Sequence, residues 1–147
     1  MSRRTWKLLV LLSLGMATCC FGAACEAQAF MIDGSSPVVC AFSKAFACDV
    51  VSGCEGSTIE DFNLPRFFKV DFKNNKIISL GAAVEGGVRK ETPIKSVGRG
   101  DGTLVLQGID LRGWTMVISE DSGYMVLTGA GNDEAFVLFG DCIGPEK

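Results

Sequence analysis

Cysteines are the residues of this chain with the most distinctive chemistry, and the chain holds seven of them. Four lie beyond the N-terminal region, at Cys40, Cys48, Cys54 and Cys142. Structural zinc sites are built on closely spaced C-x2–4-C pairs, whereas three of these cysteines are spaced C-x7-C-x5-C and the fourth is far away. The sequence therefore predicts two disulfides. Of the three possible pairings we favour Cys48–Cys54, across a short loop, with Cys40–Cys142, which ties the two chain ends together.

The histidine-dependent catalytic sites are excluded, because the chain contains no histidine. Neighbouring carboxylates occur at Glu60-Asp61, Glu120-Asp121 and Asp133-Glu134. A glycosidase, by contrast, holds its two acids across the sugar from separate elements. Ser43-Lys44 makes no catalytic dyad either, since neighbours on a strand point to opposite faces. We predict a protein that is not an enzyme and has no catalytic residues, cofactor or metal site.

Two short motifs resemble ligand-binding signatures, and we interpret both as turns. Arg99-Gly100-Asp101 spells the tripeptide that integrins recognise, but glycine and aspartate are also what a tight turn requires. Residues 129–133 resemble one turn of the glycine-aspartate calcium repeat. A single copy cannot stack into the repeated structure that completes calcium coordination. The second motif is therefore predicted to be a hairpin loop.

The N-terminal region is typical of an export signal. Arg3, Arg4 and Lys7 precede an apolar run over residues 8–14, and Ala27-Gln28-Ala29 offers the small side chains that signal peptidase requires. We expect cleavage after Ala29, so that residues 1–29 are a signal peptide and residues 30–147 are the mature domain. Cleavage removes three cysteines and leaves an even number, as two disulfides require.

Three other interpretations of this leader are open. An uncleaved membrane anchor is one alternative, because the apolar stretch almost reaches the length of a membrane span. Residues 2–7 resemble a twin-arginine signal, but the strongly hydrophobic run that follows favours the general secretory route. Lipidation at Cys25 is disfavoured, because residues 22–25 lack the aliphatic residue of a lipoprotein box. The predicted location is periplasmic or secreted.

The expected mature chain is acidic. Residues 1–29 contain three of the 14 basic residues and one of the 17 acidic ones, which leaves 11 against 16 and a net charge of −5. Without a basic cluster, neither nucleic acid nor an anionic membrane is an expected partner. Residues 30–147 are long enough for a single domain with its own core.

Alternating apolar and polar residues from residue 66 onward predict a succession of short strands. The expected strands and turns are residues 67–73, an Asn74-Asn75 turn, residues 76–80, a loop or weak strand over 81–92, a strand at 94–97, a turn at 98–102, a strand at 103–109 apolar on both faces, a turn at 112–113, a strand at 114–119, a turn at 120–123, and strands at 124–128 and 135–139. The N-terminal third is predicted to be looser and tied by disulfides. Ser57-Thr58-Ile59-Glu60 fits a capping box and predicts one short helical turn at residues 58–62. The predicted fold is all-β, an antiparallel meander forming a small barrel or sandwich.

Aromatic residues are the candidates for a ligand pocket or an interaction surface. Six of them could line a pocket inside a barrel or form ordinary core: Phe67, Phe68, Phe72, Trp114, Phe136 and Phe139. Phe67 and Phe68 are consecutive and must face opposite sides, so Phe67 is a candidate exposed anchor. Phe42 and Phe46 are expected to cover one mouth of a barrel. A possible interaction surface combines Phe67 with Ser122, Gly123 and Tyr124.

Several runs resemble uncharacterised small exported proteins of Gram-negative bacteria. The runs are residues 63–72, Thr92-Pro93-Ile94, residues 104–108 and, close to the end of the chain, Phe139-Gly140-Asp141-Cys142. The resemblance covers most of the mature chain. It implies a periplasmic or secreted bacterial protein and carries no activity.

Ser122-Gly123-Tyr124 and Glu134-Ala135, ahead of Cys142, are similar to a loop pattern of periplasmic inhibitors of C-type lysozyme. The spacing differs, and the lysine that usually follows that loop is missing. An acidic domain would suit a cationic lysozyme. The leading expectation is an exported, non-enzymatic module that binds a protein partner, an envelope component or a small apolar ligand. The alternative is an inhibitor of a hydrolase such as lysozyme.

Overall fold

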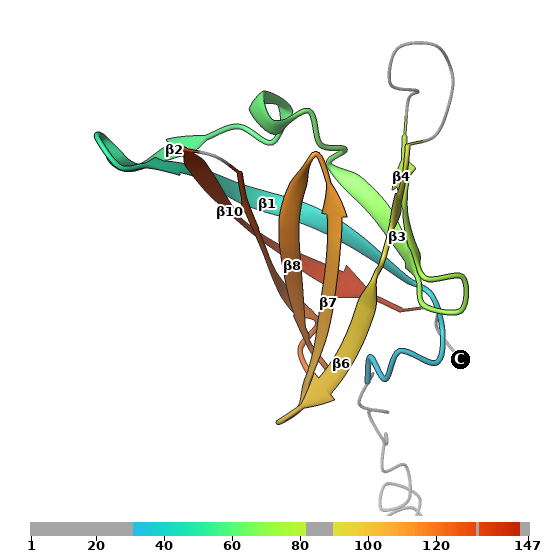
Figure 1. Ribbon diagram of the computed structural model, residues 1–147. Coiled ribbons are helices and arrows are strands. Elements are labelled where there is room, and N and C mark those ends of the chain that lie inside the picture. Colours follow the sequence, from blue (N-terminus) through green and yellow to red (C-terminus); the bar gives the residue numbers. More distant parts are fainter. Residues whose placement is uncertain (1–30, 82–89, 132, 145–147) are drawn as a thin grey trace, which may run out of the picture.

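A computed structural model of the chain describes residues 31–81, 90–131 and 133–144, and these residues form one antiparallel sheet curled into a half-barrel (Figure 1). The predicted signal peptide, Cys25 and the centre of the predicted loop over residues 81–92 lie outside these ranges. The elements are β1 (Val38–Asp49), β2 (Gly53–Ser57), the 3-10 turn η1 (Glu60–Phe62), β3 (Phe67–Asp71), β4 (Lys76–Leu80), β5 (Glu91–Pro93), β6 (Ser96–Gly100), β7 (Thr103–Asp110), β8 (Arg112–Ser119), β9 (Tyr124–Ala130) and β10 (Glu134–Ile143). The all-β prediction is confirmed.

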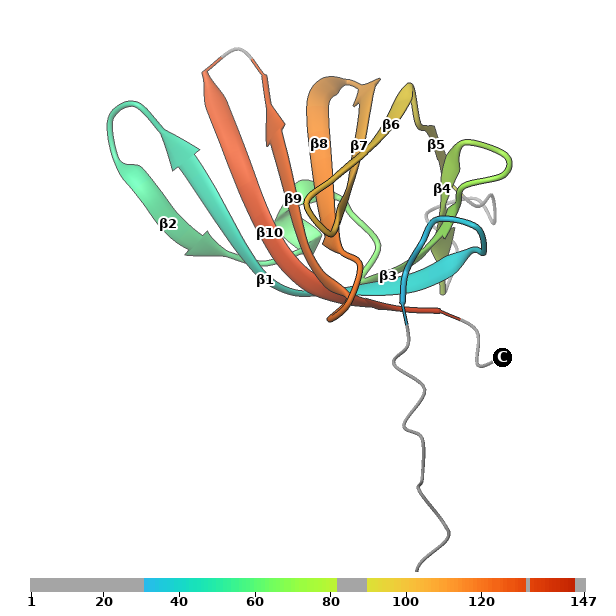
Figure 2. The same ribbon diagram turned by 90° about the horizontal axis from the view of Figure 1, so that it is seen from below.

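The sheet has the strand order β5-β4-β3-β1-β10-β9-β8-β7-β6, with β2 paired to β1 beside this path. Its two edge strands, β5 and β6, are consecutive in the chain. The link between them is hydrogen-bonded to the β3–β4 turn and to β7, because Ile94 N donates to Asn75 O at 2.8 Å and Lys95 N donates to Gln107 O at 2.8 Å. Figure 2 shows the resulting curl. A single curled sheet favours the barrel-like alternative over two stacked sheets.

The first strand is the main departure from the expected fold. Residues 38–49 were predicted to be loose, yet β1 is a 12-residue strand at the centre of the sheet. It pairs with β10 on one side and with β3 and then β2 on the other. A register shift between Phe42 and Lys44, at Ser43, interrupts the alternation of buried and exposed residues. Because of this bulge, no continuous period of two is visible in the sequence.

Both favoured disulfides are present. Cys40 and Cys142 face each other in the β1–β10 ladder, with a Cα–Cα distance of 4.0 Å, and both are buried in the core. Cys48 and Cys54 face each other in the β1–β2 ladder, also at 4.0 Å. Cys40 and Cys48 are an even number of residues apart, but the bulge shifts the phase between them. The first disulfide therefore lies on the inner, concave face of the sheet and the second on its outer, convex face.

The short helical turn lies where it was expected, but its cap is shifted by one residue. Thr58 N donates to Asp61 Oδ2 at 2.9 Å, and Asp61 N donates to the Thr58 hydroxyl at 3.3 Å. Glu60, the predicted partner of Ser57, instead forms an ion pair with Arg66 at 3.0 Å. The reciprocal bonds of a capping box are therefore made by Thr58 and Asp61.

Strand β7 is buried on one face only, although it was expected to be apolar on both. Leu104 and Leu106 are buried, whereas Ile109 is 69% exposed. The preceding turn is made by Asp101 and Gly102, which have φ values of 51° and 72°. Such a two-residue turn with positive φ matches the twist of a hairpin, so β6 reaches Gly100 and not Val97 as expected.

The core lies on the concave face. Its buried side chains are Ile32, Val38, Cys40, Phe42, Ala45, Ile59, Phe68, Val70, Ile94, Leu104, Leu106, Met116, Ile118, Met125, Leu127, Phe136, Leu138 and Cys142. Within the part of the chain that the structure covers, no helix is long and apolar enough to cross a membrane.

Candidate binding cavity

Large and small residues alternate along one row of the concave face. The ladders place Gly108 of β7 opposite Trp114 of β8, Trp114 opposite Gly129 of β9, Gly129 opposite Phe136 of β10, and Phe136 opposite Ala47 of β1. A Cβ at Gly108 would lie 2.2 Å from Trp114 Cζ2, and one at Gly129 would lie 2.1 Å from Phe136 Cζ. Each aromatic ring therefore covers a neighbouring glycine, and no larger residue fits beneath it.

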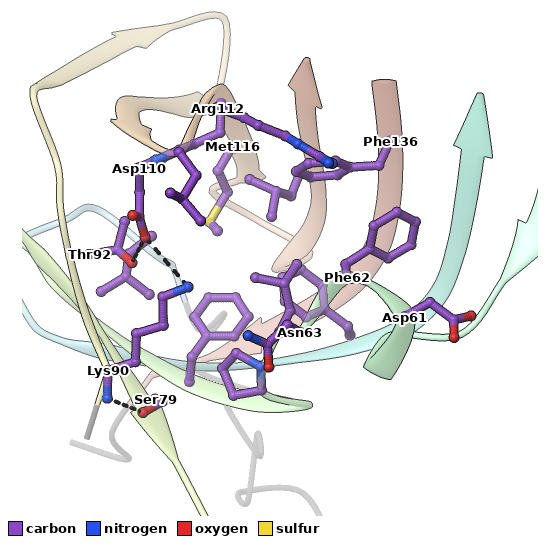
Figure 3. Close-up of a pocket in the computed structure, with 18 of the residues that line it drawn as sticks. Asp61, Phe62, Asn63, Ser79, Lys90, Thr92, Asp110, Arg112, Met116 and Phe136 are labelled. Carbon is purple, nitrogen blue, oxygen red and sulfur yellow. Dashed lines mark hydrogen bonds and ion pairs between the residues drawn. The ribbon is translucent and has the colours of Figure 1, made fainter. Parts of the chain in front are cut away.

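This row forms part of the wall of a cavity of about 560 Å³ (Figure 3). The apolar part of the lining comes from β1, β3, β4, β8, β9 and β10, from the segment around η1 and from the β7–β8 turn. Its residues are Phe42, Ala47, Phe62, Leu64, Pro65, Phe68, Ile77, Leu111, Trp114, Met116, Leu127 and Phe136. Phe62 packs on Phe136 with the ring centroids 5.3 Å apart. Several lining residues also belong to the core, so the cavity borders the core directly; they include Phe42, Phe68, Met116 and Leu127.

A polar group on one side of the cavity consists of Ser79, Lys90, Thr92 and Asp110. Lys90 Nζ lies 3.6 Å from Asp110 Oδ2, and the Thr92 hydroxyl donates to the same oxygen at 3.1 Å. The backbone N–H of Lys90 donates to the Ser79 hydroxyl at 3.0 Å, which joins the residue before β5 to β4. In Figure 3 the Lys90 side chain reaches into the cavity, where its ammonium meets Asp110.

A second ion pair lies along the β8 and β10 side. Arg112 Nη2 contacts Glu134 Oε1 at 3.0 Å, and the Arg112 guanidinium carbon lies 6.0 Å from the centre of the Phe136 ring. Arg112 therefore contacts both the Glu134 carboxylate and the face of the Phe136 ring.

Asp61 is a third carboxylate in the lining. The backbone N–H of Thr58 and the hydroxyls of Thr58 and Ser57 lower the pKa of Asp61 below its ordinary value of 3.8. Hydrogen bonds to a charged carboxylate favour the ionised form. Asp61 is therefore held as a local anion that fixes η1, and it does not have the raised pKa of a general acid.

The structure brings together only some of the aromatic residues predicted to line a pocket. Phe68, Trp114 and Phe136 line the cavity, and so does Phe42, which was expected at a mouth. Phe139 packs on Phe46 on the convex face, with centroids 6.1 Å apart, and Phe67 and Phe72 are absent from the lining. Nothing in the sequence indicated that Phe62 or the charged residues Lys90, Asp110, Arg112 and Glu134, which we call the charged rim, would line a cavity. The local pattern predicted the turn at η1 but not which part of the sheet it packs against.

The predicted interaction residues lie on the convex face and at one end of the sheet. Phe67 is 51% exposed and Tyr124 is 69% exposed. The ladders join them through Ala41 and Asp141, so three strand spacings, about 14 Å, separate them. Ser122 is exposed beside Tyr124. Gly123 is buried, and its carbonyl accepts a hydrogen bond from Cys142 N at 2.8 Å.

The two ligand-like motifs are placed as follows. Arg99 forms an ion pair with Glu120 at 2.5 Å and donates to the backbone carbonyl of Asp33. Its guanidinium is thus engaged with the protein, although the side chain is 52% exposed. In the predicted hairpin loop, Gly131 N donates to Glu134 O at 3.0 Å, whereas Asn132 lies outside the described residues. Among the side chains that the structure describes, no group of three or more could hold a metal ion.

The fold and the cavity define a small, disulfide-bonded, all-β domain with an apolar cavity in a curled sheet. The chain matches no protein family model, no curated protein and no solved structure. Its function is therefore inferred from the cavity itself.

Proposed function

We propose that this protein is an exported, non-enzymatic binding module of the cell envelope and that the cavity is its binding site. The carrying observation is the cavity of about 560 Å³, whose largely apolar wall is interrupted by two ion pairs, Lys90–Asp110 and Arg112–Glu134, and by the carboxylate of Asp61. Small-molecule sites in proteins are typically about 300–1,000 Å³, predominantly apolar, and contain a few placed polar groups. A small apolar or amphipathic ligand fits this description.

The two disulfides support the export part of the proposal. Cysteines remain paired in oxidising compartments and are kept reduced in the cytosol. The mass of the intact protein recovered from outside the cytoplasm tests it directly. We expect a chain that begins at Phe30, and a chain that retains Met1 would contradict cleavage.

The charged rim supports a binding role. Asp110 contacts Lys90 and Thr92, and Glu134 contacts Arg112, so the acids are held by neighbouring groups. Such paired charges can orient the polar end of a ligand.

Trp114 provides a direct test of binding. The chain has two tryptophans, Trp6 and Trp114, so Trp114 is the only one in residues 30–147, and it lines the cavity. Titration of the mature protein with anilinonaphthalene sulfonate, a hydrophobic fluorescent probe, should change Trp114 emission saturably with one probe per chain. Absence of saturable binding would contradict the proposal.

A matched pair of variants locates the probe. Ala47→Phe places a ring beside Phe136 in the cavity and should abolish probe binding. Ala135→Phe makes the same change one residue before Phe136, where the side chain faces the convex side, and should leave binding unchanged. Equal binding by both variants would show that the probe binds elsewhere.

The inhibitor alternative is favoured by one observation, the turn before β9. Ser122 and Tyr124 are exposed, while Gly123 between them is anchored to Cys142. A rigid, acidic protein with such a turn would suit a cationic lysozyme. This alternative requires stoichiometric inhibition of C-type lysozyme that Tyr124→Ala relieves, and absence of inhibition at micromolar excess would exclude it.

A further inference from the structure

Lys90 is the charged residue of the cavity with unused hydrogen-bonding capacity, and Trp114 Nε1 is a buried neutral donor in the same lining without a partner among the described residues. The Lys90 ammonium can donate three hydrogen bonds. The nearest carboxylate oxygen, Asp110 Oδ2, is 3.6 Å away, which is an ion-pair distance and too long for a good hydrogen bond. Within the described part of the chain the ammonium makes no hydrogen bond, and Figure 3 shows the side chain extended into the cavity.

The other charged groups of the lining are more fully engaged. Asp110 accepts a hydrogen bond from Thr92 at 3.1 Å, and Glu134 accepts one from Arg112 at 3.0 Å. Asp61 accepts hydrogen bonds from Thr58 N and the Ser57 hydroxyl, each at 2.9 Å. The carboxylates therefore have their donors, whereas the Lys90 ammonium lacks an acceptor at hydrogen-bond distance. A ligand oxygen with negative charge complements this imbalance better than a ligand cation does.

Asn63 adds a second polar group across the cavity from Lys90. Its backbone is left-handed, with φ at 53°, and its N–H donates to Glu60 O at 2.9 Å, which fixes the residue at the end of η1. In Figure 3 its side chain lies on the wall that faces Lys90. Asn63 therefore offers a second donor in the same cavity, on the wall that faces Lys90.

The apolar lining next to this polar group has the character of a site for one hydrocarbon chain. Phe68 and Met116 are buried, and Trp114 and Phe136 extend the apolar wall across β8 and β10. A cavity of about 560 Å³ has room for one chain of moderate length.

We propose that the cavity binds a single-chain amphiphile with a carboxylate head, the carboxylate on Lys90 and Asn63 and the chain along Trp114 and Phe136. This inference rests on the proposed binding function and adds the chemical class of the ligand. Charge complementarity at Lys90 selects the head group, and the apolar wall selects the tail.

Calorimetric titration of the mature protein with decanoate, decanol and decylamine tests the head group, because the three probes share one chain length. We expect decanoate to bind about tenfold more tightly than decanol, as one charge-assisted hydrogen bond would allow, and decylamine to bind most weakly. Equal binding of all three, or tightest binding of decylamine, would overturn the carboxylate inference and leave the proposed function standing. Failure of all three to bind would contradict both.

Three variants then test the role of Lys90. Lys90→Gln should reduce decanoate affinity to the level of decanol and leave decanol binding unchanged. Lys95→Gln makes the same change at an exposed lysine outside the lining and should bind decanoate like the unmodified protein.

Asp110→Asn should strengthen decanoate binding, since it removes the carboxylate nearest to the Lys90 ammonium. Retention of full decanoate affinity by Lys90→Gln, or weaker binding by Asp110→Asn at unchanged thermal stability, would overturn the assignment of the head group to Lys90.

Discussion

The ring of Phe136 covers the backbone of Gly129 on the neighbouring strand so closely that a Cβ at Gly129 would lie 2.1 Å from Phe136 Cζ. Phe62 and Arg112 contact the same ring, so it is packed between two strands, the segment of η1 and a guanidinium. The size of one residue on β9 therefore controls the position of a ring that lines the cavity.

Gly129→Ala should destabilise the protein by about 1–3 kcal/mol, because the added methyl group forces Phe136 out of its position. The displaced ring moves towards the cavity, so probe binding should weaken as well. Thermal unfolding followed by calorimetry measures the first effect. Gly113→Ala is the matched control, since a Cβ at Gly113 meets nothing within 4 Å. Equal stability of the two variants would contradict this account of the ring.

The two disulfides should contribute unequally to stability. Cys40–Cys142 joins residues separated by 102 positions, whereas Cys48–Cys54 joins residues separated by 6. Loop-closure entropy predicts a loss of about 4.7 kcal/mol for the first and about 2.4 kcal/mol for the second. Removing each pair as a double Cys→Ala variant avoids free thiols, and chemical denaturation gives the two losses. A larger loss from the Cys48–Cys54 pair would contradict the prediction.

Asp71 should make the stability of the protein sensitive to acid. The Asn74 side chain donates to Asp71 Oδ2 at 2.9 Å and its backbone N–H donates to Oδ1 at 3.1 Å, and these bonds lower the pKa of Asp71 below its ordinary value of 3.8. A carboxyl group whose pKa is lower in the folded than in the unfolded state stabilises the fold at pH values above its unfolded-state pKa. This stabilisation is lost as the pH falls through the folded-state pKa. Asp71→Asn should therefore lower the urea midpoint at about pH 7, and the difference should shrink as the pH falls below 3.8, the ordinary pKa of the carboxyl group.

The control for Asp71 is Asp141→Asn, which changes an exposed carboxylate of β10. This variant should keep the urea midpoint of the unmodified protein across the same range. A constant difference between Asp71→Asn and the unmodified protein at every pH would show that the carboxylate charge plays no part.

The bulge in β1 predicts opposite outcomes for two single deletions. Without Ser43 the ladder becomes regular, and Lys44 still faces Phe139 on the convex side. Without Ala45 the extra residue of the bulge is also lost, but Lys44 then takes the buried position opposite Leu138. Burial of its unpaired charge strongly destabilises the folded state. We expect the Ser43 deletion to keep both disulfides and the Ala45 deletion to lose the folded state. Mass spectrometry after thiol alkylation without reduction distinguishes them, and equal behaviour would contradict the assigned register.

Local patterns in the sequence were sufficient for much of the sheet. The strand predicted at residues 76–80 coincides with β4, and the alternation of Trp114, Met116 and Ile118 predicted β8. Turn residues and a period of two act over a few neighbouring positions, so they can be read along the chain. Strand β1 escaped detection because its period changes phase at Ser43, where pairing with β10 and not local sequence decides the geometry.

The all-β class and the succession of short strands followed from the sequence, because alternation expresses them directly. The sequence favoured one of three cysteine pairings, and the β1–β10 and β1–β2 ladders decided it. The cavity did not follow from the sequence, because its aromatic wall is assembled from residues of separate strands. Gly108, Trp114, Gly129, Phe136 and Ala47 meet only through the registers of five strands. Lys90 reaches this wall only because the sheet curls and brings the segment before β5 close to the end of β7. Such non-local geometry depends on how the whole sheet closes, so only the tertiary structure decided where a ligand could bind.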